Sequence, residues 1–297
     1  MLWGLDIGGT KTAFLTGDRE GNILSRKEVA TRDYSDWEAV LNAVMPAPGT
    51  LPVPEAVGVS CGGPLDSARG VILSPPNLPG WDAVPVTEWL RERYGSPAFL
   101  QNDANACALA EWKFGAGRGT KNMVFLTFGT GFGGGLILDG RLYSGTNDQA
   151  GELGHVRMAP DGPVGYYKAG SAEGFCSGGG LRQLSMLRLG KDLTAKELCL
   201  AAGKGDGEAQ SVIKESARYL GMALSILVDV LNPERIVIGS IFARAESLFR
   251  EEMERVMQEE CLGLSLSVCR VVPAELGDRI GDVAALTVAV NGLAGEK

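Results

Sequence analysis

The chain has 297 residues, of which 45% are hydrophobic and 22% charged, and its formal net charge is −8. This composition excludes a disordered chain, and the length favours two domains over a single core. The acidic balance excludes non-specific binding to nucleic acid or to an anionic membrane, because both need a basic surface.

The first half of the sequence predicts short strands alternating with helices. Strands are expected at 2–7, at 12–16 and from Ile23, with the glycine turn Gly8-Gly9 after the first. A helix with a serine cap is expected over 35–45. The pattern then favours a strand at 57–60, a helix at 86–94, a strand at 98–101 and a helix at 103–114.

The second half opens by repeating the first. A strand at 122–128, a glycine turn at 129–135, a strand at 136–138 and a hairpin turn at Asp139-Gly140 echo residues 2–24. The repeat predicts two related domains, which we place at 1–115 plus 283–297 and at 116–282. We further expect long helices near 207–231, strands at 235–239 and 266–272, and a terminal helix near 281–293.

Cysteine spacing and the lack of a targeting segment indicate a cellular compartment. The six cysteines form no C-x-x-C pair, and the N-terminus lacks the basic and apolar regions of a signal peptide. No stretch approaches the roughly 18 apolar residues that span a bilayer. We therefore expect a soluble, cytoplasmic protein with reduced thiols.

Two glycine turns are candidate phosphate sites. Gly8-Gly9-Thr10-Lys11 would direct backbone N–H groups towards phosphate oxygens, and Asp6 before it would hold Mg²⁺ through water. A tight hairpin with an incidental acid is an equal alternative. The segment 129–134 matches the dinucleotide pattern G-x-G-x-x-G, but that site needs a helix after the turn. Because a strand is expected there, a second phosphate-binding turn fits better.

Polar residues between these turns are candidates for catalysis and ligand binding. Asp103 lies between a strand and a helix, where it either caps the helix or accepts the proton of an attacking hydroxyl in phosphoryl transfer. Glu152, Glu173 and the only histidine, His155, lie in glycine-rich loops. A polar turn with a hydrogen-bonded histidine is the simpler alternative, but together the three would suit a polyhydroxylated ligand.

Five segments together resemble the ROK family of sugar kinases and related repressors, within the actin-like ATPase superfamily. They are DIGGTK (6–11), NLPGW (77–81), NDANACALAE (102–111), FGTGFGGG (128–135) and GELGH (151–155). The resemblance spans essentially the whole chain and implies a two-domain α/β fold of the actin-like, ribonuclease H-like type, with the ligand cleft between the domains. It implies transfer of phosphoryl from ATP, with Mg²⁺, to a hydroxyl, expected to be the 6-hydroxyl, of a hexose such as glucose, fructose, mannose or an N-acyl hexosamine. Relatives are usually homodimers.

The resemblance also assigns roles to residues. It makes Asp103 the base. It places on the sugar side Gly63, Asn77, Asn102, Glu152, His155 and Glu173. It places near the phosphates Gly8, Gly9, Thr10, Lys11, Thr130, Gly131 and Gly133. Gly239 belongs to the adenosine side, where the family often has two glycines and this chain has Gly239-Ser240.

One departure from the family concerns zinc. Most members follow the GH motif with a C-x-C-G-x-x-G-C zinc pattern, but residues 165–173 contain no cysteine. Cys176 and His155 alone cannot make a closed four-ligand site, so we expect no structural zinc. We expect Tyr166, Tyr167 and Phe175 to pack this loop apolarly instead.

Alternative functions follow from the same residues. The family's repressors carry a DNA-binding domain before the first glycine turn, and we expect none here because that turn begins at residue 8. The lost zinc pattern leaves open a catalytically silent sugar or nucleotide sensor. A kinase with a non-sugar acceptor, and polyphosphate as the phosphoryl donor, also stay open.

Overall fold

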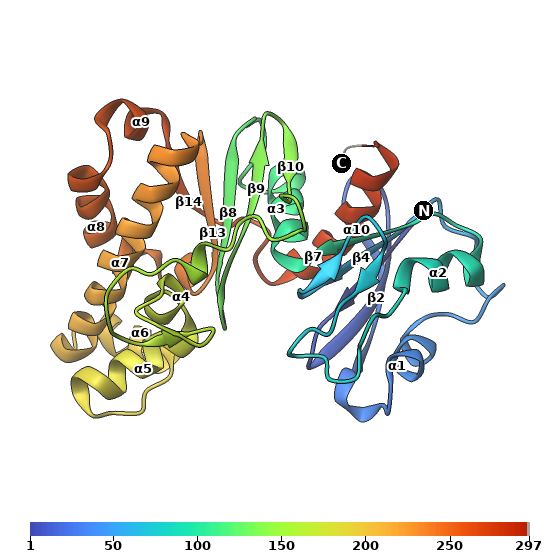
Figure 1. Cartoon of the computed structure of the whole chain (residues 1–297), viewed down its shortest axis with the longest axis horizontal. Coiled ribbons are helices and arrows are strands. Elements are labelled where there is room, and N and C mark those ends of the chain that lie inside the picture. The colour runs from blue at the N-terminus through green and yellow to red at the C-terminus, as the bar shows by residue number, and fades with distance from the viewer. Residues whose placement is uncertain (296–297) are drawn as a thin grey trace. The chain divides into compact units, whose positions relative to one another are not determined.

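The computed structural model describes residues 1–295, which form two compact α/β units (Figure 1). Unit 1 comprises residues 1–119, 135–150 and 278–295, and unit 2 comprises residues 120–134 and 151–277. Residues 135–150, which the sequence analysis assigned to the second domain, group with unit 1. None of the described helices is long and apolar enough to cross a membrane.

Unit 1 is built on a five-stranded sheet with the order β3-β2-β1-β4-β7. Its strands are β1 (Leu2–Ile7), β2 (Lys11–Gly17), β3 (Ile23–Ala30), β4 (Val57–Cys61) and β7 (Ala98–Asn102). The first three are antiparallel neighbours, whereas β1, β4 and β7 run parallel. A two-stranded hairpin follows β4, made of β5 (Leu65–Asp66) and β6 (Val71–Ile72). The helices are α1 (Trp37–Val44), α2 (Val86–Tyr94), α3 (Asp103–Phe114) and α10 (Ile280–Leu293).

Alternation along β1 decides what each face of this sheet contacts. Trp3, with Leu5 and Ile7, joins the large core that includes α1 and α2, and its ring meets Phe14 edge to face at 5.2 Å. The opposite face packs against α10. A Cβ added to Gly58 of β4 would collide with the carbonyl oxygen of Ala285, so this strand can only carry glycine where the helix approaches.

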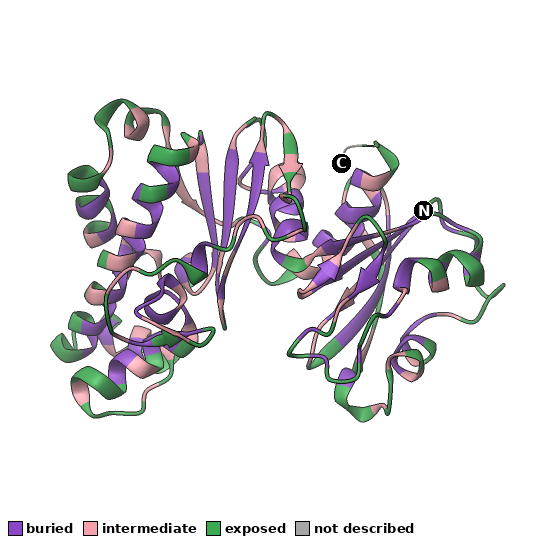
Figure 2. Cartoon of the chain, viewed as in Figure 1, coloured by how far each residue is buried: buried purple, intermediate pink, exposed green. Residues whose placement is uncertain are grey.

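The second sheet repeats the strand order of the first, as β10-β9-β8-β13-β14. Its strands are β8 (Met123–Phe128), β9 (Phe132–Leu138), β10 (Arg141–Tyr143), β13 (Arg235–Ser240) and β14 (Arg270–Pro273). As in the first sheet, the later strands pair parallel, β13 with β8 and with β14. The chain passes from unit 2 to unit 1 within β9. The predicted duplication of a β-turn-β unit is confirmed, and in both sheets buried residues run along the strands (Figure 2).

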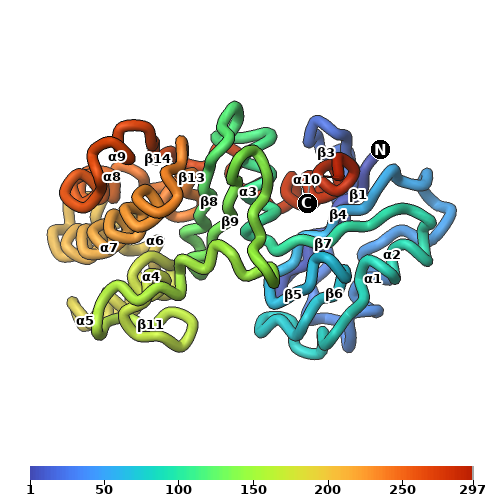
Figure 3. Tube along the Cα trace, turned by 45° about the horizontal axis from the view of Figure 1, so that its top comes forward, coloured from blue at the N-terminus to red at the C-terminus, as the bar shows by residue number. Residues whose placement is uncertain are grey.

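Helices make up most of the rest of unit 2. They are the 3₁₀ helix η2 (Leu153–His155), α4 (Ala172–Phe175), α5 (Gly178–Leu189), α6 (Ala195–Gly203), α7 (Gly207–Leu231), α8 (Ile241–Glu260) and α9 (Gly263–Val268). The long helices α7 and α8 lie side by side, and α8 also contacts β13 and β14 (Figure 3).

Three local predictions differ from the structure. The strand β9 begins at Phe132, so most of the glycines expected in a turn lie inside a strand, where Gly135 packs against Ala108. The strand expected over 266–272 is split into the end of α9 and β14, because a short apolar run is compatible with either state. Asp36, not serine, caps α1 and accepts a hydrogen bond from the Ala39 N–H at 2.8 Å.

Candidate active site

The carboxyl ends of the parallel strands in unit 1 bring several predicted residues together. Asp6 of β1 pairs in register with Ser60 of β4, and Cys61 of β4 pairs with Asn102 of β7. A Cβ added to Gly63 would lie 3.3 Å from Asn102 Nδ2. Ligands of open α/β sheets bind at this end of the parallel strands, so the fold places these side chains where a substrate is expected.

Asp103 begins α3, but Asn102 provides most of the cap. Asn102 Oδ1 accepts hydrogen bonds from the N–H groups of Ala104 at 2.9 Å and Asn105 at 3.4 Å. Asp103 Oδ1 accepts a hydrogen bond from the Ala104 N–H at 2.8 Å, and the backbone N–H of Asp103 itself also interacts with the carboxylate. Asp103 is exposed to solvent. One carboxylate oxygen therefore stays available for a substrate hydroxyl, as a base requires.

The environment of Asp103 also favours proton uptake. Although its side chain reaches solvent, the protein around the carboxyl group removes part of its hydration and raises its pKa, and the Ala104 N–H opposes this rise. A Cβ added to Gly62 would lie 3.8 Å from Asp103 Oδ2, so the absence of a side chain at this glycine keeps the space beside that oxygen open.

Asp6 lies on the α10 face of its sheet because it alternates with the core residues of β1. Its Oδ2 lies 2.9 Å from where a Cβ on Gly281 would be, in the first turn of α10. Burial and the charges of Asp103 and Asp282 raise the pKa of Asp6 to about 6, although Ser60 donates a hydrogen bond to it. A carboxylate supplemented by water is a donor set that Mg²⁺ accepts, so Asp6 fits the predicted metal role.

Hydrogen bonds of the backbone and of side chains fix the conformation of the first glycine turn. The Gly8 N–H donates to the carbonyl of Lys11 at 3.0 Å, and Thr31 Oγ1 donates to the carbonyl of Gly8 at 2.7 Å. The Lys11 ammonium pairs with Glu28 at 2.7 Å. Thr31 and Glu28 were not singled out from the sequence, because their partners lie 17 to 23 residues away along the chain.

Gly9 connects this turn to Asn77. A Cβ on Gly9 would collide with the Asn77 carbonyl oxygen and lie 3.0 Å from its Cβ. Residues predicted for the phosphate side and for the sugar side are therefore in direct contact within unit 1.

The second glycine turn, in unit 2, is fastened by Glu173. The Phe132 N–H donates to Glu173 Oε2 at 3.0 Å, and a Cβ on Gly131 would lie 2.8 Å from the same oxygen. The Gly178 N–H donates to the carbonyl of Gly129 at 2.7 Å. Thr130 is exposed at the tip of this turn, while Gly133 lies within β9. Glu173 was predicted on the sugar side, and its contact with the turn could not be read from the sequence.

Gly239 lies inside β13, opposite Thr127 of β8, and a Cβ there would contact the Phe125 ring at 3.4 Å. The next residue, Ser240, has a φ of 58° and a ψ of −116°, a conformation that favours glycine. Its Oγ would lie 3.3 Å from a Cβ on Gly129. The strained serine therefore stands beside the second glycine turn.

The segment that carries Glu152 and His155 packs beneath these residues. A Cβ on Gly154 would collide with the Phe132 carbonyl oxygen and lie 3.4 Å from Glu173 Cβ. Glu152 and His155 themselves are exposed. Unit 2 thus gathers three predicted sugar-side residues, Glu152, His155 and Glu173, around the start of β9.

Hydrogen bonds hold the loop that follows His155. It forms a small hairpin of β11 (Val164–Gly165) and β12 (Lys168–Ala169). Lys168 Nζ donates to the carbonyl of His155 at 2.7 Å, and Arg157 Nη1 donates to that of Ala169 at 2.7 Å. The amide of Gln183 exchanges two bonds of 2.8 Å with the backbone of Val164. These bonds tie the hairpin to His155, Arg157 and Gln183.

The predicted apolar packing of this loop is right for one residue and wrong for two. Phe175 is buried and stacks on Tyr219 with ring centroids 3.5 Å apart. Tyr166 and Tyr167 occupy the hairpin turn and are 60% and 91% exposed. Both side chains lie mostly in solvent, so they cannot form the core of the loop. Cys176 is buried, and its thiol donates weakly to the Ser216 carbonyl at 3.8 Å.

We expect Lys168→Met to loosen the loop. The variant loses the bond to the His155 carbonyl, which is worth about 1 kcal/mol, so amides of residues 153–169 should exchange roughly fivefold faster. Hydrogen exchange with mass spectrometry measures this directly. Lys191→Met is the matched control, because Lys191 pairs with Glu208 on another surface of unit 2. Unchanged protection of 153–169 in Lys168→Met would show that the ammonium does not hold the loop.

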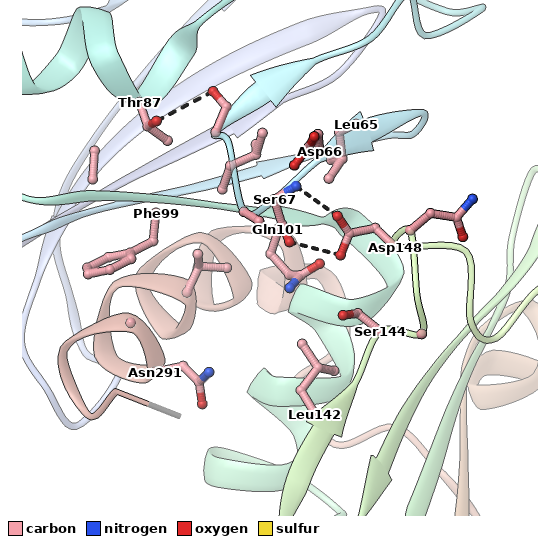
Figure 4. Close-up of a pocket in the computed structure, with 18 of the residues that line it drawn as sticks. Leu65, Asp66, Ser67, Thr87, Phe99, Gln101, Leu142, Ser144, Asp148 and Asn291 are labelled. Carbon is pink, nitrogen blue, oxygen red and sulfur yellow. Dashed lines mark hydrogen bonds between the residues drawn. The ribbon is translucent and has the colours of Figure 1, made fainter. Parts of the chain in front are cut away.

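A separate cavity of about 930 Å³ lies in unit 1 (Figure 4). Asp148 lies at its edge, where its carboxylate accepts from the N–H and Oγ of Ser67, both at 2.8 Å. Gln101 reaches the cavity from β7 and also accepts a hydrogen bond from the Asn102 N–H at 2.8 Å. No residue predicted for the sugar or phosphate side lines this cavity, so it is distinct from the candidate site.

Sequence comparisons give consistent relatives. The sequence model of the ROK family matches residues 2–291. The chain is 33% identical over 308 residues to the glucokinase of Streptomyces coelicolor, covering 96% of each protein. It is 30% identical over 295 residues to the N-acetyl-D-glucosamine kinase of Photobacterium profundum, covering 95% of this chain and 96% of that protein.

A structural comparison adds a ligand complex. The crystal structure of a ROK family glucokinase from Streptomyces griseus, in complex with glucose and AMPPNP, matches with a TM-score of 0.74 at 30% identity. The match covers 97% of this chain and 98% of that one. Sugar and nucleotide are thus bound together by a protein to which this chain is similar along nearly its whole length.

Proposed function

The chain belongs to the ROK family and is an ATP-dependent sugar kinase, and from that premise we propose that it phosphorylates the 6-hydroxyl of a hexose with Asp103 as base. Its relatives include glucokinases and an N-acetyl-D-glucosamine kinase. Glucose is therefore our first candidate acceptor, with mannose, fructose and N-acyl hexosamines as the others.

One observation carries the assignment of the base. Asp103 stands at the carboxyl end of β7 beside Gly62, and its carboxylate meets two backbone N–H groups, those of Ala104 and of Asp103 itself. Asn102, not Asp103, provides most of the N-terminal cap of α3. A carboxylate that is positioned by the fold, yet keeps an oxygen for an incoming hydroxyl, suits proton abstraction in phosphoryl transfer.

In the proposed reaction the phosphoryl group passes directly from ATP to the sugar, and the protein accepts only a proton. The 6-hydroxyl gives its proton to Asp103 as its oxygen attacks the γ-phosphorus in line, and ADP departs. The backbone N–H groups of Gly9 and Thr10 in the first turn, and of Thr130 and Gly131 in the second, are the donors we propose for the phosphate oxygens. Mg²⁺ held through Asp6 and water would neutralise phosphate charge. Asn77, Asn102, Glu152, His155 and Glu173 are the proposed partners of the sugar hydroxyls, and Gly239 lies on the proposed adenosine side.

ADP release from Mg·ATP, measured with glucose, mannose, fructose and N-acyl hexosamines, tests the proposal. Turnover with a hexose, and product with phosphate on oxygen 6, supports it. Sugar binding in calorimetry without ADP release would favour the sensor. ADP release only with a non-sugar acceptor would replace the proposed substrate class. A parallel reaction with polyphosphate tests the alternative donor.

Substitutions of Glu173 can separate its proposed contact with the sugar from its hydrogen bond to the second glycine turn. Because its carboxylate fastens the second glycine turn through Phe132, Glu173→Ala should raise KM for both sugar and ATP, by about tenfold each. Glu173→Gln keeps a carbonyl acceptor for the Phe132 N–H. It should therefore restore KM for ATP but not fully KM for sugar. Equal recovery of both constants, or no change in KM for ATP in the alanine variant, would contradict the dual role.

The homodimer implied by the family resemblance stays a prediction. Light scattering on the purified protein decides it.

A further inference from the structure

The turn of the β11–β12 hairpin has a backbone shape that its residues disfavour. Val164 pairs with Ala169 and Gly165 with Lys168, so Tyr166 and Tyr167 form a two-residue turn. Their φ values are 41° and 64°. Turns with positive φ at both positions strongly prefer pairs such as Asn-Gly or Asp-Gly, and a bulky residue there is strained.

The same chain shows the favoured solution elsewhere. The β9–β10 hairpin also has a two-residue turn, at Asp139-Gly140, with φ values of 51° and 73°. The unusual residues of the β11–β12 turn are therefore not imposed by the turn geometry itself.

Burial does not compensate the strain of the two tyrosines. Tyr166 is 60% exposed and Tyr167 91% exposed, so little apolar area leaves water on folding. Their rings touch each other at a centroid distance of 5.5 Å, and Tyr166 meets the His155 ring edge to face at 6.1 Å. Strained residues of this kind persist where the strained geometry serves a function.

The hairpin is fixed against the sugar-side residues of unit 2. A Cβ on Gly165 would lie 2.7 Å from Glu173 Cβ, and Lys168 Nζ is bonded to the His155 carbonyl. Tyr166 directly follows Gly165, and Tyr167 directly precedes Lys168, so both tyrosines are next in the chain to a residue that contacts the sugar-side residues. The aromatic pair presents apolar ring surface beside His155, where the proposed function places the acceptor.

We propose that Tyr166, supported by Tyr167, is a specificity-determining contact for the acceptor sugar. Aromatic rings bind apolar C–H groups, which on this acceptor are the C–H face of the hexose ring or the methyl of an N-acyl substituent. The inference rests on the proposed function, because it needs a sugar beside His155.

The test replaces the turn with Asn-Gly, as Tyr166→Asn plus Tyr167→Gly. Relief of strain should raise Tm by about 2–5 °C. Loss of the aromatic contact should raise KM for the acceptor about 2- to 10-fold while KM for ATP stays unchanged. If KM rises equally for glucose and N-acetylglucosamine, the tyrosine contacts the C–H face of the hexose ring. If KM rises only for N-acetylglucosamine, the tyrosine contacts the methyl of the acyl group.

Two controls separate strain relief from sugar contact. Asn232→Gly relieves the left-handed residue that ends α7, with φ of 46°, and should raise Tm without changing KM for sugar. Tyr143→Asn removes another tyrosine, 52% exposed on β10, and should change neither.

The outcomes distinguish the inference from the proposed function. A double variant that is more stable but keeps the wild-type KM for both sugars would show that the tyrosines do not contact the sugar. A double variant with a lower Tm would show that the turn is not strained, and the inference would lose its basis. If the wild-type enzyme makes no ADP with any sugar, the proposed function fails first and this inference with it.

Discussion

Asp103→Asn should lower kcat for sugar phosphorylation by about 10²–10⁴-fold, the usual range for loss of a positioned base. Asparagine keeps the size of the side chain and an oxygen for the Ala104 N–H, so α3 and the fold should persist. ADP formation with the acceptor found in the substrate panel measures the loss, and calorimetric titration checks that ATP and sugar still bind.

A pH profile provides a second readout for Asp103. A base must be deprotonated, and desolvation raises the pKa of this carboxyl above the ordinary value of an aspartate. The value of kcat/KM should therefore fall as the pH is lowered through that raised pKa, and this acid limb should vanish in the variant. Glu20→Gln, at an exposed carboxylate in the β2–β3 turn, is the control and should change nothing. Full activity in Asp103→Asn would rule out the proposed base.

Asp6→Asn should make the ligand-free protein more stable while reducing its activity. The pKa of Asp6 is raised from 3.8 to about 6, chiefly by burial and then by Asp103 and Asp282. The folded state therefore holds this proton more tightly than the unfolded chain. Stability from that proton is present at low pH and is lost as the pH rises through about 6. Above that pH, ionised Asp6 costs on the order of 1–3 kcal/mol, which asparagine avoids.

Thermal denaturation at pH 4.5 and pH 8 tests this sign. The variant should exceed the wild type in Tm by more at pH 8 than at pH 4.5, and Mg·ATP turnover should fall about 10²-fold or more because the proposed metal contact is lost. Asp192→Asn is the control. Its carboxylate pairs with Arg182 in unit 2 and has no part in the pKa shift of Asp6, so its removal should not raise Tm at pH 8. An Asp6 variant no more stable than wild type at pH 8 would contradict the cost that we assign to this partly buried charge.

Local patterns were enough to predict most strands of the two large sheets and their duplication. The same patterns predicted α1, α2, α3, α7 and α10, whereas α4, α5, α6, α8 and α9 were not predicted. The run 2–7, the hairpin turn Asp139-Gly140 and the long helix near 207–231 all agree with the structure. Each reflects preferences that act over a few residues, such as alternation, positive φ at glycine and helical periodicity. The strand predicted over 266–272 was wrong because a short apolar run is compatible with either a helix or a strand, and contacts with the rest of the fold decide between them.

The candidate site divides in the same way. The sequence by itself determined which residues are candidates for the chemistry, because Asp6, Asp103 and the glycine turns are defined by residue type and spacing. Only the tertiary structure decided that Gly9 abuts Asn77, that Glu173 fastens the turn at Phe132, and that Tyr166 is strained and exposed beside His155. These contacts join residues 11 to 68 positions apart, and no local preference encodes them. They arise where packed elements meet, which is why the residue types could be predicted from the sequence and their partners could not.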